Sequence, residues 1–285
     1  MADRRKLLAD WEEVLIRREP LRETLGLYGE ILALWAEWAP YRGGRFEKDE
    51  AWCRARWEGG VPLLLGEVPL SREAVEPLLS GAVELLHGIR EADGPGLAKL
   101  REAWDKGEIT PSALLPTHPF FARVVLPRLG LSSDIAAFLC QIVLRPLLEE
   151  MAEPLRGLWE GRWDHGTCPF CGASAAFSDL REDGKRRLLC YLCGSDWGFL
   201  RIRCAFCDNR NPNTLKIFSP EEEEGYFVEA CDLCRGYLKG LDRRLRWNVV
   251  SSLLEDWGSP HLDLIALEKG YWRSGPSLVL LAREG

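Results

Sequence analysis

Eight cysteines in the second half of the chain are arranged as four Cys-x-x-Cys pairs. The pairs are Cys168 with Cys171, Cys190 with Cys193, Cys204 with Cys207, and Cys231 with Cys234. Two thiolates three positions apart on a tight turn can reach the same ion, and two such turns together supply a tetrahedral four-sulfur site. The four pairs therefore predict two sites, each for one Fe or Zn ion.

The residue after each pair bears on whether the chain can form a metal knuckle. A knuckle bends back sharply, so a residue that tolerates positive φ is favoured directly after its second cysteine. Gly172 and Gly194 hold that position in the first two pairs. Asp208 in the third pair is a tolerable substitute, whereas Arg235 in the fourth is a poorer one. The fourth knuckle is therefore expected to fit the pattern least well.

The segments between the pairs predict two hairpins, which decide how the pairs combine. The first joins residues 177–180 to 185–189 through Asp183-Gly184, and the second joins residues 214–219 to 226–230 through the acidic turn 220–225. Knuckle, strand, turn, strand and knuckle is the plan of a zinc ribbon or rubredoxin-like module. We therefore expect the first pair to join the second and the third to join the fourth. A cross-braced arrangement, first with third and second with fourth, stays open.

Disulfides and redox catalysis are the two rival interpretations of these cysteines. The chain begins with polar residues and no apolar signal segment, so we expect a reducing cytoplasm in which thiols stay free. A thioredoxin-like motif would place one pair at the start of a helix in a βαβ pattern, which hairpins do not resemble. The motif therefore favours a bound metal.

Composition narrows the class of protein further. The 285 residues are 46% hydrophobic with a net charge of −7, which is typical of a globular chain and argues against a nucleic-acid binder. The sequence offers no stretch long enough to insert into a membrane. Because each four-thiolate site with a divalent ion carries about −2, nearby cations should balance it. The candidates are Arg181, Lys185, Arg186, Arg187, Arg201, Arg203 and Arg235.

Apolar residues recur every three or four positions through residues 1–160, which predicts an all-α domain. The expected helices cover residues 6–17, 21–35, a short stretch around Trp52 and Trp57, 72–89 after an N-cap at Ser71, 97–104, and 135–158. The stretch 93–96, Asp-Gly-Pro-Gly, is expected to end the fourth of these helices. Pro20 is expected to open the second.

Other residues that could bind a metal have a simpler interpretation. Cys53 and Cys140 have no partner at ligand spacing and are expected to be buried as small hydrophobic side chains, and His87 and His118 are interpreted in the same way. His165 could replace a cysteine, but eight thiolates make it redundant. After the last pair, residues 237–241 should extend the second ribbon, 262–268 should form a helix, and the apolar residues 277–281 should pack on the helical domain.

The chain carries no motif that indicates catalysis. It lacks a Gly-rich phosphate loop, a Gly-x-Ser-x-Gly elbow and a His-Glu-x-x-His sequence. A site with four cysteine ligands is closed and offers no position for water or substrate. We therefore expect a protein that is not an enzyme.

Four stretches of the cysteine-rich region resemble the FdhE family of formate dehydrogenase accessory proteins. These are residues 163–171, Arg187-Leu-Leu-Cys-Tyr-Leu-Cys-Gly-Ser-Asp-Trp197, Arg203-Cys-Ala-Phe-Cys207 and Glu229-Ala-Cys-Asp-Leu-Cys-Arg-Gly-Tyr-Leu-Lys239. With the later Leu262-Asp-Leu-Ile-Ala-Leu-Glu-Lys-Gly-Tyr271, the resemblance covers roughly the last 120 residues. It implies a cytoplasmic maturation factor whose two rubredoxin-like modules can hold iron and which contacts the catalytic subunit of formate dehydrogenase during assembly.

The sequence therefore predicts an α+β protein that acts as an assembly chaperone. Its expected parts are a helical domain over residues 1–160, ribbon modules over 161–200 and 201–242, and a short helical tail over 243–285. The expected docking face lies between the ribbons and the helical domain, where Trp197, Phe206 and Tyr237 are candidate exposed aromatics. The alternatives are a rubredoxin-like electron carrier and a zinc-ribbon factor associated with nucleic acid, the latter disfavoured by the acidic charge.

Overall fold

The computed structural model describes residues 3–38, 46, 48–65, 69–89, 91–117, 125–221, 223–246, 249 and 251–283. The described helices are α1 Arg4–Arg17, α2 Gly26–Glu37, α3 Glu50–Glu58, α4 Arg72–His87, α5 Gly94–Asp105, α6 Leu126–Leu129, α7 Ser133–Ala152, α8 Ser252–Trp257, α9 Pro260–Glu268 and α10 Leu278–Arg283. The strands are β1 Ala175–Leu180, β2 Arg186–Cys190, β3 Asp196–Gly198, β4 Leu215–Phe218, β5 Tyr226–Cys231 and β6 Tyr237–Asp242. The predicted α+β class is confirmed.

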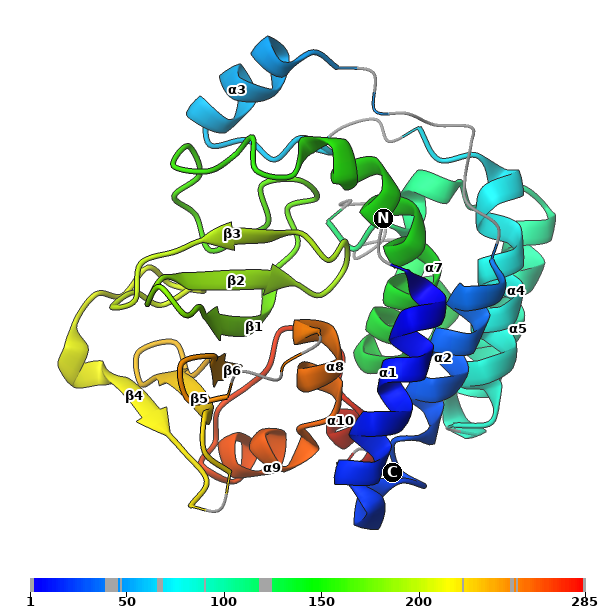
Figure 1. The fold of residues 1–285 in the computed structure, drawn as a ribbon. Helices are drawn as coiled ribbons and strands as arrows, with labels where there is room; N and C mark the ends of the chain where they lie inside the picture. Colours follow the sequence, from blue (N-terminus) through cyan, green and yellow to red (C-terminus); the bar gives the residue numbers. More distant parts are fainter. Residues whose placement is uncertain are drawn as a thin grey trace.

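Helices α1, α2, α4, α5 and α7 pack on one another beside the sheet (Figure 1). Leu78 and Leu79 of α4 and Phe138 and Ile142 of α7 are fully buried in the shared core. The predicted cap of α4 is confirmed, because the side chain of Ser71 accepts a hydrogen bond from the Ala74 amide at 3.2 Å. The described part of residues 1–160 contains helices and no strand, as predicted.

Two predicted helix boundaries were wrong by five residues or more. α2 begins at Gly26 rather than at residue 21, because Pro20 opens a separate 3-10 turn, Glu19–Leu21, whose partly buried Leu21 packs against the same core as α2. A shared apolar face cannot reveal such a break. α7 ends at Ala152 rather than at residue 158, since Pro154 lacks the amide hydrogen that would continue it.

The stretch predicted to end α4 instead opens α5. α4 stops at His87, and α5 begins at Gly94 with Pro95 in its first turn, where the missing amide hydrogen costs nothing. Gly96 lies against the Leu129 carbonyl and the Leu131 side chain so closely that a Cβ would come within 3.0 Å of that carbonyl oxygen. The glycine therefore serves helix packing rather than a turn.

The strands form one six-stranded sheet in the order β3-β2-β1-β6-β5-β4 within the described residues. Both predicted hairpins are confirmed, and residues 237–241 lie in β6, which pairs with β5 as predicted. Two features were not predicted, the edge strand β3 and the parallel pairing of β1 with β6. In that pairing Phe177 lies opposite Lys239, so the two hairpins share a single sheet.

The C-terminal segment covers the side of the sheet built from β5 and β6 (Figure 1). Leu262 and Ala266 of α9 pack against Tyr226, Val228 and Tyr237 in a second apolar core. The predicted helix at residues 262–268 is confirmed as α9, whereas α8 was not predicted. Leu278 and Leu281 of α10 join the core of the helical half. None of the described helices combines the length and the apolar character needed to cross a membrane.

Candidate metal centres

The first two Cys-x-x-Cys pairs bring their sulfur atoms together in a buried set. The Sγ atoms of Cys168, Cys171, Cys190 and Cys193 all lie within 4.8 Å of one another. Cys168 and Cys193 are 3.4 Å apart at their sulfurs, and Cys171 and Cys190 are 3.5 Å apart. All four side chains are buried. We call these four cysteines the first set.

The third and fourth pairs form a second set with more exposure. The sulfurs of Cys204, Cys207, Cys231 and Cys234 also lie within 4.8 Å of one another. The distance is 3.7 Å between the sulfurs of Cys204 and Cys234 and 3.8 Å between those of Cys207 and Cys231. In this set Cys207 is exposed and Cys234 is half-buried.

Both sets group the pairs in sequence order rather than in the cross-braced order. The sulfur separations fit a tetrahedral ion, because bonds of about 2.3 Å place two ligand sulfurs about 3.8 Å apart. A disulfide would need about 2.05 Å, and the described cysteines are all free thiols. The donor set, four cysteine sulfurs and no oxygen or nitrogen, is the one that zinc and iron share in structural sites.

All four knuckles have the positive φ that their bend requires. The residue after the second cysteine has φ of 77° at Gly172, 68° at Gly194, 62° at Asp208 and 62° at Arg235. In each knuckle that residue donates its amide hydrogen to the carbonyl of the first cysteine, at distances between 2.8 and 3.3 Å. The fourth knuckle is therefore as regular as the others, and the expectation of a poorer fit there was wrong.

Asp208 and Arg235 are the only non-glycine residues with positive φ in the described chain, and both side chains are held. Asp208 forms an ion pair with Arg203. The guanidinium of Arg235 lies 4.0 Å from the ring centre of Tyr271 and donates to the Lys269 carbonyl at 2.5 Å. These contacts offset a backbone conformation that costs a non-glycine residue roughly 1–2 kcal/mol.

The electrostatics of the sets favour a bound cation. Burial raises the pKa of the Cys168 and Cys171 thiols well above the ordinary value, so these thiolates need compensating positive charge. In the second set burial also opposes ionisation of Cys231, but the Cys234 amide and the Asn209 side chain donate to its sulfur. Together they lower its pKa to about 7. The Asn209 contact measures 3.3 Å.

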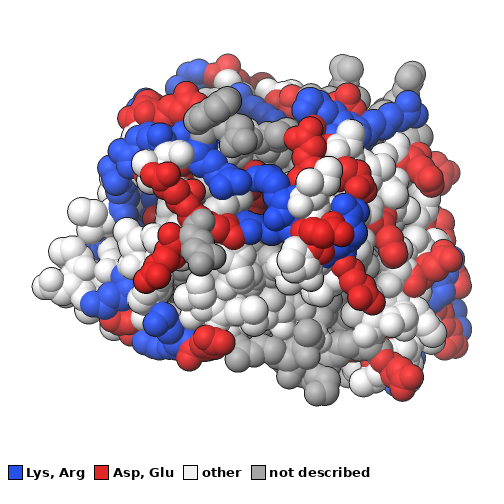
Figure 2. Space-filling view, turned by 60° about the horizontal axis from the view of Figure 1, so that its bottom comes forward, with Lys and Arg blue, Asp and Glu red and all other residues white. Residues whose placement is uncertain are grey.

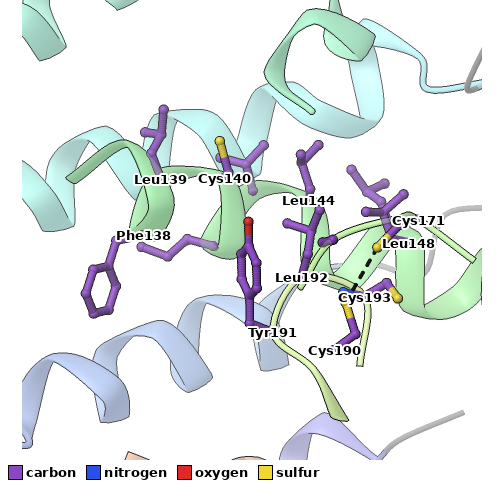
Figure 3. Packing of buried hydrophobic residues seen from close by; sticks show 14 of the residues in the cluster. Phe138, Leu139, Cys140, Leu144, Leu148, Cys171, Cys190, Tyr191, Leu192 and Cys193 are labelled. Atoms are coloured by element: carbon purple, nitrogen blue, oxygen red, sulfur yellow. Dashed lines mark hydrogen bonds between the residues drawn. The ribbon is translucent and has the colours of Figure 1, made fainter. Parts of the chain in front are cut away.

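The second knuckle of the first set is inserted into the helical core. Tyr191 and Leu192, which lie between its cysteines, are buried among Cys140, Leu144 and other side chains of α7 (Figure 3). The Tyr191 carbonyl accepts hydrogen bonds from Gln141 and Arg145 of α7, both at 2.9 Å. Side chains of α7 therefore hold this knuckle in place through hydrogen bonds to the knuckle's backbone.

The first knuckle of this set is held by the segment that contains α3. The Pro169 carbonyl accepts from the Trp57 indole at 3.0 Å and from the Leu63 amide at 3.1 Å. Phe170 is fully buried, and its carbonyl accepts from the Leu64 amide at 2.9 Å. Both knuckles of the first set thus depend on residues of the helical half.

The cations expected to balance the thiolates pair mainly with carboxylates instead. Arg186 pairs with Glu229, and Arg187 pairs with Asp196. The ion pairs of Arg181, Lys185, Arg203 and Arg235 are likewise with aspartates. Figure 2 shows one face of the molecule on which Lys and Arg side chains lie beside Asp and Glu side chains, in keeping with such pairing. The expectation was wrong because acidic residues on neighbouring strands and loops compete for these arginines.

The sequence did not single out the cation that does lie beside the first set, Arg145. This side chain is 4% exposed, and it also approaches the Cys190 carbonyl at 3.5 Å. Gln141, one turn earlier, is 2% exposed. The sequence did contain a signal for this contact. Gln141 and Arg145 lie four residues apart on an otherwise apolar helix face, and buried polar groups need hydrogen-bond partners.

The other candidate ligands lie outside both sets. Cys53 and Cys140 are fully buried, as expected, and the Cys140 thiol donates to the Leu114 carbonyl at 3.1 Å. His165 is exposed and packs its ring on Trp163. His87 is exposed in the last turn of α4, so its expected burial was wrong. His118 lies outside the described residues.

Two of the three aromatics proposed for docking are buried. Trp197 is 1% exposed and donates to the His165 carbonyl at 2.9 Å. Tyr237 is fully buried, with its hydroxyl donating to Asp263 at 2.8 Å. Phe206 is partly buried and contacts Trp272. Proximity to a knuckle did not imply exposure, because Trp197 packs in the core of the helical half and Tyr237 packs with residues of α9.

The fold and the two sets define an α+β protein with paired zinc-ribbon-like four-cysteine modules beside a helical half. Over its full length the chain superposes on the crystal structure of the FdhE protein from Pseudomonas aeruginosa with a TM-score of 0.61 and 27% identity, covering 96% of that chain. It is 30% identical over 240 residues to Protein FdhE of Escherichia coli O127:H6, covering 72% of that relative. The chain belongs to the FdhE family.

Other curated relatives match over shorter stretches. A Protein FdhE homolog from Aquifex aeolicus is 32% identical over 146 residues, and one from Stutzerimonas stutzeri is 36% identical over 124 residues. The chain spans 51% and 40% of the length of these two relatives. No family model matches the chain.

Proposed function

We propose that this chain is an accessory protein for the assembly of formate dehydrogenase. In this proposal it holds two Fe or Zn ions, binds the immature catalytic subunit in the cytoplasm and performs no turnover of its own. Membership of the FdhE family supports the link to formate dehydrogenase. The observation that carries the proposal is the grouping of eight sulfurs into two sets of four.

The residues that would hold the ions are the eight paired cysteines. They are Cys168, Cys171, Cys190 and Cys193 in the first set and Cys204, Cys207, Cys231 and Cys234 in the second. An ion held by four thiolates ties distant parts of the backbone together and has no ligand position left for a substrate. The chain would therefore act through the shape of its surface, which supports a binding role over catalysis.

The surface that docks the partner must differ from the one first expected, since Trp197 and Tyr237 are buried. Among the described residues, exposed aliphatic side chains lie around the second module. Those at least 50% exposed are Leu200, Ile202, Ile217, Leu233 and Leu245. Exposed aliphatic groups of this size are typical of contact surfaces when they lie together. We propose this side of the molecule as the contact with the catalytic subunit.

Co-purification tests the proposal. The tagged full-length chain, loaded with zinc or with iron, is used to capture the formate dehydrogenase catalytic subunit from an extract that contains it. Comparable capture by both forms is expected, because the two ions share their thiolate geometry. Ile217→Asp should reduce capture, whereas Ile16→Asp, on the exposed side of α1 with 69% exposure, serves as the matched control. Failure of both loaded forms to capture the subunit would contradict the proposal.

One observation favours a second candidate, a rubredoxin-like electron carrier. Cys207 is exposed, so an iron ion in the second set would lie near the protein surface, where an electron can pass to a partner. A carrier needs an ion that changes oxidation state, and zinc does not. If the zinc form captures the catalytic subunit but does not restore formate dehydrogenase activity in cells, the carrier becomes the better account.

A further inference from the structure

Access from solvent separates the two four-cysteine sets. All four side chains of the first set are buried. In the second set Cys207 is exposed and Cys234 is half-buried, and the neighbouring Leu233 is 70% exposed. The second set is therefore the more accessible of the two to a reagent in solution.

A cavity adds a second approach to the same set. Its volume is about 210 Å³, and Cys204 and Cys231 lie in its wall together with Phe206 and Gly236. That volume is about 14 to 21 times the space of about 10–15 Å³ that one water molecule requires. Water or a small ligand can thus approach the second set from the cavity as well as from the exposed side.

The contacts that hold each set in place also differ. Opening the first set would break the contacts of Tyr191 with α7 and of Pro169 with Trp57, which are part of the core of the helical half. Openings that disrupt a core approach the cost of global unfolding. The fourth knuckle, by contrast, is held by contacts nearer the surface. The Trp272 indole, 43% exposed, donates to the Cys234 carbonyl at 2.7 Å, and the Arg235 side chain, 44% exposed, donates to the Lys269 carbonyl at 2.5 Å.

Given the proposed function, in which both sets hold an ion, we infer that the two sites have different roles. The first site is a permanent part of the fold that ties the sheet to α3 and α7. The second site exchanges its ion with small thiol or chelating ligands from solution. The chain can then lose or regain one ion while its helical half stays folded.

Release of zinc measures this difference directly. The full-length chain loaded with zinc is mixed with the chromogenic chelator 4-(2-pyridylazo)resorcinol, and absorbance follows the zinc transferred. Two phases of equal size are expected, one ion per chain in each, with rates that differ by at least about tenfold. Release of both ions in a single phase would overturn the inference. A chain that takes up no zinc would instead contradict the proposed function.

Cysteine labelling assigns the phases. N-ethylmaleimide is added at the end of the fast phase, and the modified positions are found by peptide mass spectrometry. Labels are expected on the second set, while Cys140 and the first set stay protected until denaturant is added. Labels that appear first on Cys168, Cys171, Cys190 or Cys193 would overturn the assignment.

A variant provides an independent check. The double substitution Cys231→Ser with Cys234→Ser should remove the fast phase and leave one slowly released ion. A fast phase that persists in this variant would contradict the inference. If the variant fails to fold, labelling of the unaltered chain still decides between the two sites.

Discussion

Arg145 of α7 donates a hydrogen bond to the carbonyl of Tyr191, inside the second Cys-x-x-Cys pair, at a distance of 2.9 Å. Gln141 donates to the same oxygen at 2.9 Å. The Tyr191 carbonyl oxygen thus accepts hydrogen bonds from two side chains of α7. This arrangement makes the geometry of the first set dependent on the helical half, and it leads to the first prediction.

Arg145→Met should weaken both the fold and the first set. The substitution keeps a side chain of similar length but removes a charged donor from a buried carbonyl, which costs roughly 1–3 kcal/mol. Urea unfolding followed by circular dichroism measures the loss. Arg54→Met is the matched control, because its ion pair with Glu50 is exposed and such pairs contribute about 1 kcal/mol or less. Equal stability of the two variants would contradict the role of Arg145.

A buried charge network under the sheet leads to the second prediction. Arg273 donates to both carboxylate oxygens of Asp256 at 2.7 Å, and Lys239 lies 2.9 Å from Asp263 and 3.1 Å from Asp256. All four side chains are at most 6% exposed. Arg273→Met leaves two buried carboxylates with one cation, so we expect a loss of about 3–5 kcal/mol in the free energy of unfolding.

The control for that network is the exposed Lys106→Met, whose pair with Glu102 lies on the surface of the helical half. If the free energy of unfolding falls no more in Arg273→Met than in Lys106→Met, the network contributes little to the stability of the fold. If both variants also retain their zinc, the network stabilises the C-terminal segment and is not needed for metal binding by the four-cysteine sets.

The acid stability of the same network gives a third prediction. Burial raises the pKa of Asp263, but Lys239 and Arg273 more than offset this, so its pKa lies below the ordinary value. Its stabilising contribution is therefore complete above the unfolded-state pKa of about 3.9 and is lost as the pH falls through the lower folded-state pKa. Below pH of about 4 the free energy of unfolding should fall less steeply in Asp263→Asn, by up to about 1.4 kcal/mol per pH unit. Identical slopes in the two proteins would refute this.

The positive φ of Arg235 leads to a fourth prediction. Arg235→Ala loses the contacts with Tyr271 and Lys269 and keeps the unfavourable backbone conformation, whereas Arg235→Gly loses the contacts but removes the strain. The alanine variant should be the less stable of the two by roughly 1 kcal/mol, as measured by thermal unfolding. Gly184, with φ of 77° and open space around it, allows the matched comparison Gly184→Ala. An alanine variant at 235 as stable as the glycine variant would contradict the account of this knuckle.

The sequence predicted the features that depend on short spacing. Two cysteines three residues apart, a glycine after them and Asp183-Gly184 between two apolar runs each report a local geometry, and the structure contains all of these turns. The grouping of the eight sulfurs follows from the hairpins, since each hairpin brings its two knuckles to the same end.

Features that depend on residues far apart could not be predicted in the same way. The parallel pairing of β1 with β6 places Phe177 beside Lys239, and no local signal indicates such a contact. The burial of Trp197 and the hold of Arg145 on Tyr191 likewise depend on how the helical half meets the sheet. The prediction that Arg186 and Arg187 balance the thiolates was based on charge alone. It missed their carboxylate partners, Glu229 and Asp196, because these lie on other segments.

The measurement that tests the central claim most directly is the number of ions held by the unaltered chain and the ligands of each. Protein purified without oxygen is examined by native mass spectrometry for ion count and by X-ray absorption for coordination. We predict two ions per chain, each with four sulfur ligands at about 2.3 Å, and a fall to one ion in the variant with Cys190→Ser and Cys193→Ser. Fewer than two ions in the unaltered chain, or a shell containing nitrogen or oxygen ligands, would contradict the account.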